Sequence, residues 1–212
     1  MTPRFIAFPF IALLCACGQQ QAANTTGQPA DSAAIQSSSS DRTVSPSQLI
    51  VPGHSVGHTY LNESTAAVEK RLGLADEGDA AMGKSLYTWY NRHDTTGFQT
   101  SIYSETKMGV DDTSRVKQIR ITSPWFMTSE GLGVNASLKN IIAAGYLVTK
   151  AASFVEHTHK VDLYDTDKGI AFEIGAENEL CSGIIIHEVS RPVSATYLPF
   201  HPGAQKNCLS LK

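Results

Sequence analysis

The chain has 212 residues, of which 17 are Lys or Arg and 20 are Asp or Glu, and its formal net charge at pH 7 is −3. It has no block of basic residues, which argues against nucleic acid as a partner. After the first 17 residues, no apolar run approaches the length of a transmembrane helix, so the composition favours a domain of ordinary size.

Residues 1–17, MTPRFIAFPFIALLCAC, have the layout of a secretory signal, in which a positive charge precedes an apolar run that ends in small residues. The final Leu14-Cys15-Ala16-Cys17 resembles a bacterial lipobox. The resemblance implies cleavage before Cys17 and acylation of that cysteine; the alternative is a plain signal peptide with an incidental cysteine. Gly18 follows in place of an acidic residue, which by resemblance to Gram-negative lipoproteins implies the outer membrane, with the protein facing the periplasm.

Residues 18–48 are dominated by Gln, Ser, Ala and Thr and contain few large apolar side chains. Such a segment cannot bury enough apolar surface to offset its ordering entropy, so we expect a flexible tether. The remaining chain is expected to form the head, with a first repeat at residues 49–124 and a second repeat with a C-terminal tail at residues 125–212.

Local patterns in the head predict two short helices and several strands. A helix is expected at residues 61–73, with Asn62 as a possible cap and Gly73 at its end. A second helix is expected at residues 135–144. Apolar and β-branched residues predict strands on either side of the second helix, at residues 85–91, 97–105, 116–123, 160–165, 169–174 and 183–189.

The order of these elements suggests a duplicated unit. Both expected helices open with Asn-x-Ser, at Asn62 and Asn135, and corresponding features recur about 70 residues apart. We therefore predict an α+β fold of two tandem repeats. Each repeat would hold a short helix and three to four antiparallel strands, and the two would form one continuous sheet with the helices on one face.

This organisation resembles the tandem fold of the β-lactamase inhibitory protein and the single-unit fold of BamE-type outer-membrane lipoproteins. A helix signature of those families is matched in spacing by Ser64, Val68, Leu72 and Gly73. The resemblance implies a lipoprotein that acts by binding. It gives no basis for placing the inhibitor's contact residues on this chain.

The segment Gly78–Ser85, GDAAMGKS, matches the phosphate-binding loop pattern of nucleotide-binding proteins. That loop requires a buried strand before it and a helix after it, so that N–H groups at the helix N-terminus face the phosphate. Here an expected helix precedes the segment and an expected strand follows it. We therefore interpret it as a connecting loop and expect neither a nucleotide nor another cofactor.

Three further patterns receive structural interpretations. His157 and His159 could share a strand face, but no third ligand accompanies them, so we expect no metal site. The segment 165–169, DTDKG, lacks the later ligands of a calcium loop and is expected to be a hairpin turn. The segment 53–57, GHSVG, has the letters of a nucleophile elbow without its strand-to-helix context, and no catalytic residue is assigned.

Two cysteines remain in the expected head. Cys181 and Cys208 would form a disulfide in an oxidising compartment, and the alternative is two buried thiols.

Aromatic residues are concentrated in the first half of the head. If Tyr87, Trp89 and Tyr103 lie on an open sheet face, they form a candidate partner-binding patch; otherwise they fill the core.

The sequence therefore predicts a lipid-anchored protein of the cell envelope with a non-catalytic head that binds another envelope or secreted protein. One alternative, by analogy with the resembled fold, is an inhibitor of a secreted or periplasmic hydrolase. A second alternative is an enzyme of unrecognised type.

Overall fold

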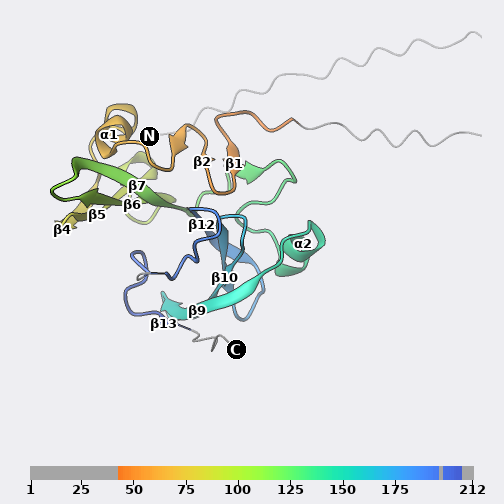
Figure 1. The fold of residues 1–212 in the computed structure, drawn as a ribbon. Helices are drawn as coiled ribbons and strands as arrows, with labels where there is room; N and C mark the ends of the chain where they lie inside the picture. Colours follow the sequence, from red (N-terminus) through yellow and green to blue (C-terminus); the bar gives the residue numbers. More distant parts are fainter. Residues whose placement is uncertain (1–42, 196–197, 207–212) are drawn as a thin grey trace, which may run out of the picture. The chain divides into compact units, whose positions relative to one another are not determined.

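The computed structural model describes residues 43–195 and 198–206, which belong to one compact unit. Strands dominate this part of the chain, and two α-helices accompany them (Figure 1). The elements in chain order are β1 (Leu49–Val51), β2 (Ser55–Val56), β3 (Thr59–Tyr60), α1 (Thr65–Leu72), β4 (Glu77–Ala81), β5 (Lys84–Tyr90), the 3₁₀ helix η1 (Asn91–His93), β6 (Gln99–Lys107), β7 (Asp111–Ile121), β8 (Met127–Thr128), α2 (Leu138–Ala143), β9 (Thr149–Glu156), β10 (His159–Asp165), β11 (Ile170–Gly175), β12 (Cys181–His187) and β13 (Gln205–Lys206).

The strands form two sheets. The larger sheet has nine strands in the order β13-β9-β10-β11-β12-β7-β6-β5-β4, with every neighbouring pair antiparallel. The smaller sheet has the order β3-β2-β1-β8, in which β1 and β8 are parallel. The edges of the larger sheet are therefore β13 and β4.

The predicted α+β fold of two helix-plus-sheet repeats with helices on one face is wrong. Strands make up 46% of the described chain and helices 10%, and the strands divide between two sheets. The prediction overestimated the helices, since α1 has eight residues and α2 has six. It also overlooked the smaller sheet, because strands of two or three residues are too short to show alternation.

The beginnings of the two helices are fixed by serine rather than asparagine. The Ser64 side chain accepts a hydrogen bond from the Ala67 N–H, and the Ser137 side chain accepts one from the Asn140 N–H. Asn62 and Asn135 have φ of 64° and 75°, so each adopts a left-handed conformation two residues before the cap. Each asparagine therefore turns the chain into its helix and does not cap it.

The larger sheet has an apolar cluster on each face. The first cluster contains Val68 of α1, Ile141 of α2 and the side chains Ile102, Ile119 and Phe172 of the sheet. The second cluster contains Phe154, Leu163 and Ile185 of the sheet together with Val193 and Leu198. Residues 190–195 and 198–206, called the C-terminal segment below, thus cover the second face and return to β9 through β13 (Figure 1).

A close approach of two turns connects the sheets. Gly169 has φ of +79°, and a Cβ atom there would lie 2.7 Å from the Cα of Gly53 and 2.5 Å from the carbonyl oxygen of His187. The Gly53 N–H donates to the Gly169 carbonyl at 3.0 Å. Glycine is required at position 169 both for its conformation and for this contact.

Candidate functional site

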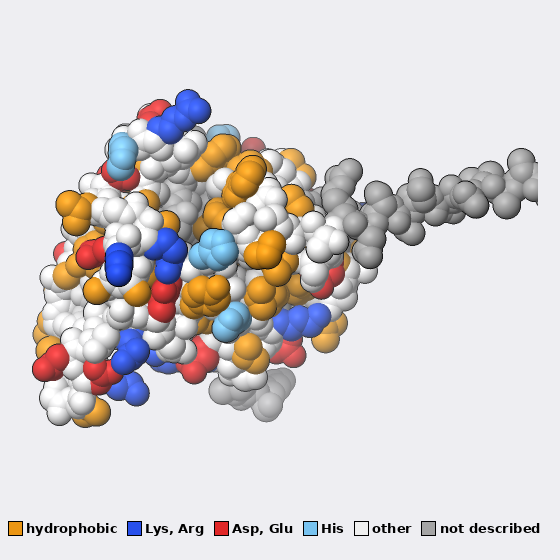
Figure 2. Space-filling view, turned by 90° about the horizontal axis from the view of Figure 1, so that it is seen from above, with side chains coloured by type: hydrophobic (Ala, Val, Ile, Leu, Met, Phe, Trp, Pro, Cys, Tyr) orange, Lys and Arg blue, Asp and Glu red, His pale blue; other side chains and the backbone are white. Residues whose placement is uncertain are grey.

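Hydrophobic and charged side chains are not evenly distributed over the surface of the head (Figure 2). On the face shown in Figure 2, hydrophobic side chains gather on one half, around histidines, while acidic and basic side chains intermingle on the other half. Within residues 43–195 and 198–206, neither helix is long and apolar enough to cross a membrane. The head has an aromatic groove and a pocket beside α1, and it also has a buried charged cluster.

The aromatic groove lies between the C-terminal end of α1, the end of β5, the start of β6 and the loop that follows β7. Its volume is about 900 Å³, and its apolar lining is formed by Leu72, Trp89, Phe98, Pro124, Trp125 and Phe126. Trp125 is 58% exposed and Phe98 is 48% exposed. Exposed aromatic side chains around a hollow of this size are typical of recognition sites.

The floor and one wall of the aromatic groove are held by hydrogen bonds. Trp89 Nε1 donates to the Gly73 carbonyl at 3.0 Å, which ties β5 to the end of α1. The Asp76 carboxylate accepts from the Tyr90 N–H at 2.7 Å and from His93 Nδ1 at 2.6 Å. The pKa of Asp76 lies below its usual range, first because of the Tyr90 N–H and then because of His93. Asp76 is therefore a carboxylate that shapes this wall.

The described chain enters the head beside this groove. The Gln48 side chain donates to the Trp125 carbonyl at 3.4 Å, and the Met127 N–H donates to the Gln48 carbonyl at 3.0 Å. The groove thus lies next to the first residues of the folded head.

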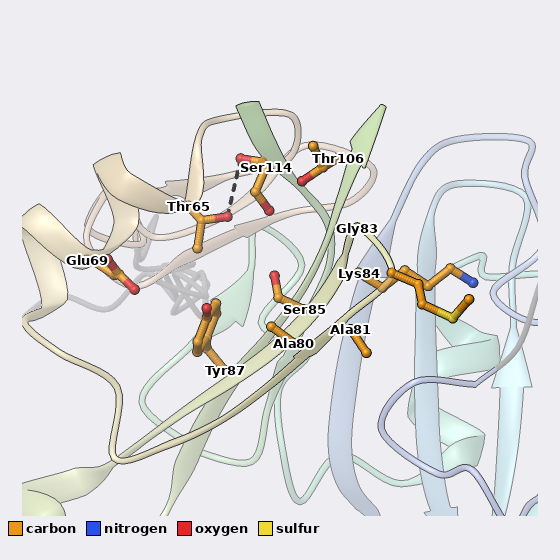
Figure 3. Close-up of a pocket in the computed structure, with 11 residues that line it drawn as sticks. Thr65, Glu69, Ala80, Ala81, Gly83, Lys84, Ser85, Tyr87, Thr106 and Ser114 are labelled. Carbon is orange, nitrogen blue, oxygen red and sulfur yellow. Dashed lines mark hydrogen bonds between the residues drawn. The ribbon is translucent and has the colours of Figure 1, made fainter. Parts of the chain in front are cut away.

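The pocket beside α1 is lined by the segment that resembles a phosphate-binding loop (Figure 3). Its volume is about 390 Å³, and Thr65 and Glu69 of α1 face Ala80 and Ser85 of the β4–β5 hairpin across it. The Ser104 hydroxyl, which is fully buried, is hydrogen-bonded to Ser85 at 2.6 Å and accepts from Thr65 at 3.2 Å.

The GDAAMGKS segment forms a β-hairpin, and the connecting loop expected there is wrong. Strands β4 and β5 pair directly across a two-residue turn, Met82-Gly83, in which both residues have positive φ. A strand follows the lysine in place of a helix, and the Lys84 side chain points away from α1 (Figure 3). The segment therefore lacks the helix N-terminus that a phosphate-binding loop provides.

A buried charged cluster lies on the second face of the larger sheet. Arg120 Nε and an Arg120 terminal nitrogen each donate to a Glu173 carboxylate oxygen at 2.7 Å. His201 Nε2 of the C-terminal segment donates to Glu173 at 2.7 Å, and Arg120 also donates to Glu156 at 2.9 Å. Burial alone would raise the pKa of Glu173, but the Arg120 charge and the hydrogen bonds from His201 and Arg120 lower it to about 2.

A second pair fastens the start of the C-terminal segment. Asp165 accepts from His187 Nε2 at 2.9 Å and from the Val193 N–H at 2.8 Å, while His187 Nδ1 contacts the Glu188 carbonyl at 3.1 Å. Both ring nitrogens of His187 therefore lie beside oxygen atoms, of the Asp165 carboxylate and the Glu188 carbonyl. The charged groups of this face are thus engaged with one another.

The structure separates the three aromatic residues proposed as one exposed patch. Tyr87 and Trp89 share a strand face, and the Tyr87 ring lies against Gly78 and lines the pocket beside α1. Trp89 is 8% exposed and lines the aromatic groove. Tyr103 is 2% exposed and pairs with Leu86, on the opposite face, where its hydroxyl donates to Glu105 at 2.7 Å. The prediction of one exposed patch is therefore wrong, because the Tyr103 side chain is buried on the face of the sheet opposite to that of Tyr87 and Trp89.

Of the three cysteines that carried predictions, Cys181 lies in the described part of the chain. Cys181 is buried at the start of β12, and its Sγ lies 3.2 Å from the Gly183 carbonyl. Cys17 and Cys208 lie outside the described residues, so acylation and the Cys181–Cys208 bond remain predictions.

The other motifs occupy turns and short strands. His157 lies in the β9–β10 turn with φ of 46°, and His159 begins β10. Ser55 of the GHSVG segment is buried in β2 and is followed by a turn and β3. In the described part of the chain, no group of three or more His, Cys, Asp or Glu side chains is arranged to hold a metal ion.

The residues that define the aromatic groove were largely missed. No sequence pattern sets Trp125 and Phe126 apart, and Leu72 was assigned only to a helix signature. Leu72, Phe98 and Trp125 come from three separate segments of the chain, so only folding brings them together around one hollow. No family model, curated protein or solved structure matches the chain.

Proposed function

We propose that this chain is a lipid-anchored protein of the cell envelope, and that its head binds a partner protein through the aromatic groove without catalysis. The observation that carries the proposal is the group of exposed side chains Leu72, Phe98 and Trp125 around a hollow of about 900 Å³. Aromatic anchors in such hollows dominate the affinity of protein interfaces.

A non-catalytic role is supported by how the ionisable groups are used. The charged cluster of Arg120, Glu173 and His201 is buried and internally paired, and Asp76 is engaged by Tyr90 and His93. These contacts stabilise the sheet and the groove wall. An outer-membrane location facing the periplasm is part of the proposal and is supported by the Leu14–Cys17 pattern and by Gly18.

Photo-crosslinking from the groove tests the binding function. A photoreactive amino acid replaces Phe98 in the full chain in cells, and Leu147, which is 82% exposed and does not line the groove, provides the control position. We expect one discrete product from position 98, its loss when Trp125→Ala is added, and no such product from position 147. Equal products from both positions, or a product from position 98 that survives Trp125→Ala, would overturn the groove as the site.

The anchor is tested separately. Cys17→Ser should abolish incorporation of radiolabelled palmitate and release the protein from membranes. Labelling that persists in Cys17→Ser would contradict acylation at this residue and would leave the groove experiment unaffected.

A further inference from the structure

Strand β4 is an uncovered edge of the nine-stranded sheet. All five of its residues are exposed, and β5 is its only strand neighbour in the described chain. Ala81 and Lys84 flank the two-residue turn and form a hydrogen-bonded pair, and hydrogen-bonded pairs alternate with non-hydrogen-bonded pairs along an antiparallel ladder. Gly78 and Ala80 belong to the non-hydrogen-bonded pairs, so their backbone N–H and C=O groups face away from β5.

Such an edge normally carries features that prevent another strand from pairing with it. In β4 these features are limited to its short length and two acidic side chains, Glu77 and Asp79. Small residues occupy the alternate positions 78 and 80, so no bulky side chain of β4 obstructs the approach of a second backbone. A strand that paired here would meet two acidic groups on one side of the sheet.

The other side of the same edge carries the pocket beside α1. Ala80 of β4 lines it, and α1 forms the opposite wall through Thr65 and Glu69 (Figure 3). Exposed apolar side chains also lie at the nearby hairpin tips, where Met82 is 90% exposed and the Met108 side chain packs over Gly83. A helix and an exposed edge strand with a pocket between them form an arrangement suited to binding an extended peptide.

We propose that β4 is a docking strand that binds an extended segment of a partner protein in which basic and apolar residues alternate. The backbone of the segment would pair with Gly78 and Ala80. Its apolar side chains would lie on the pocket side and its basic side chains beside Glu77 and Asp79, because side chains alternate between the two faces of a strand. This surface is distinct from the aromatic groove and adds a second contact to the proposed protein-binding function, on which it rests.

A second copy of the chain is the less favourable occupant. A symmetric antiparallel pairing of two β4 strands centred on Asp79 would place the two Asp79 carboxylates directly opposite one another. Like charges in that position destabilise a strand pair, whereas lysine or arginine there would stabilise it.

The test uses the full chain in detergent with two fluorescein-labelled probe peptides, acetyl-KVKVKVK-amide and acetyl-EVEVEVE-amide. Fluorescence anisotropy measures affinity, and hydrogen exchange read by mass spectrometry locates the contact. We expect the lysine peptide to bind more tightly and to slow exchange in residues 77–81, since edge amides become hydrogen-bonded. Binding that leaves exchange in residues 77–81 unchanged would overturn the proposal, as would equal affinity for the two peptides.

Three variants separate the contributions. Ala80→Pro removes an outward N–H at an edge position that tolerates proline, and it should weaken binding by at least about tenfold, the effect of roughly 1.4 kcal/mol. Asp79→Lys should reverse the preference toward the glutamate peptide. Glu177→Lys makes the same charge change at an exposed turn remote from β4 and should leave the preference unchanged.

Two further measurements distinguish binding at β4 from binding at the aromatic groove and from self-association. Trp125→Ala should retain peptide binding, so loss of the groove and loss of the edge are read independently. Sedimentation of the full chain without peptide tests self-pairing. A dimer that Ala80→Pro dissociates would show that β4 binds a second copy, and it would overturn the proposed partner.

Discussion

Replacing Glu173 with glutamine should destabilise the head by about 3 to 5 kcal/mol at pH 7, the usual cost of leaving one member of a buried ion pair unmatched. The Glu173 side chain is completely buried, and that of Arg120 is 3% exposed. In the variant, Arg120 keeps only the partly exposed carboxylate of Glu156. The free energy of unfolding is measured by urea titration, with the fluorescence of Trp89 and Trp125 as the signal.

The pH dependence gives the same prediction independently. Because folding lowers the pKa of Glu173 from 4.5 to about 2, its contribution is fully present above pH 4.5 and is lost as the pH falls toward 2. A change of that size corresponds to about 3 kcal/mol, at roughly 1.4 kcal/mol per pKa unit. The difference in unfolding free energy between the native protein and Glu173→Gln should therefore shrink as the pH falls below 4.5.

Glu156→Gln is the matched control, since Glu156 contacts the same arginine from a position that is 29% exposed. An exposed pair contributes about 1 kcal/mol or less, so this variant should remain close to the native protein in stability. Equal losses for the two variants, or a Glu173→Gln effect that is constant between pH 7 and pH 3, would refute the assignment of the stabilisation to the buried pair.

Three further predictions concern buried groups of the head. Gly183→Ala should cost about 1 to 3 kcal/mol in urea unfolding, because its Cβ would overlap the Glu173 carboxylate opposite it. A loss of less than about 0.5 kcal/mol would contradict that contact. Burial, together with a neighbouring carboxylate, raises the pKa of Tyr146 to about 12. The absorbance change of its ionisation should therefore occur at a higher pH in the folded protein than in the unfolded chain. The free energy of unfolding should fall between pH 10 and 12. Burial raises the pKa of the Cys181 thiol, so iodoacetamide should modify it only after unfolding; peptide mapping without reduction checks the predicted bond to Cys208, which would prevent modification until reduction.

β6, β7 and β11 could be predicted because each has a clear apolar pattern, whereas β9, a strand of eight residues, was not expected from the sequence. The expected strands at residues 97–105, 116–123 and 169–174 correspond to β6, β7 and β11. The hairpin of β4 and β5 was partly missed, because β4 has the sequence EGDAA, with no apolar alternation. Its strand structure comes from pairing with β5 and from the turn at Met82-Gly83.

The buried charged cluster could not be predicted for a related reason. Arg120 and Glu173 each lie between apolar residues in a strand, a pattern that normally places the charge in solvent. They are buried because the C-terminal segment covers that face, and the segment has no periodic pattern of its own. The aromatic groove has the same difficulty, since Trp125 and Leu72 are far apart in the sequence and line one hollow only in the folded chain.

The cover of the second apolar cluster comes at the end of the chain, and this has a consequence for biogenesis. Val193, Leu198 and His201 follow every strand of the sheet except β13 in the chain, so that face cannot be covered until these residues have been made. Under the proposed export of the chain, this order would leave the second face uncovered while the unfolded chain passes through a translocation channel.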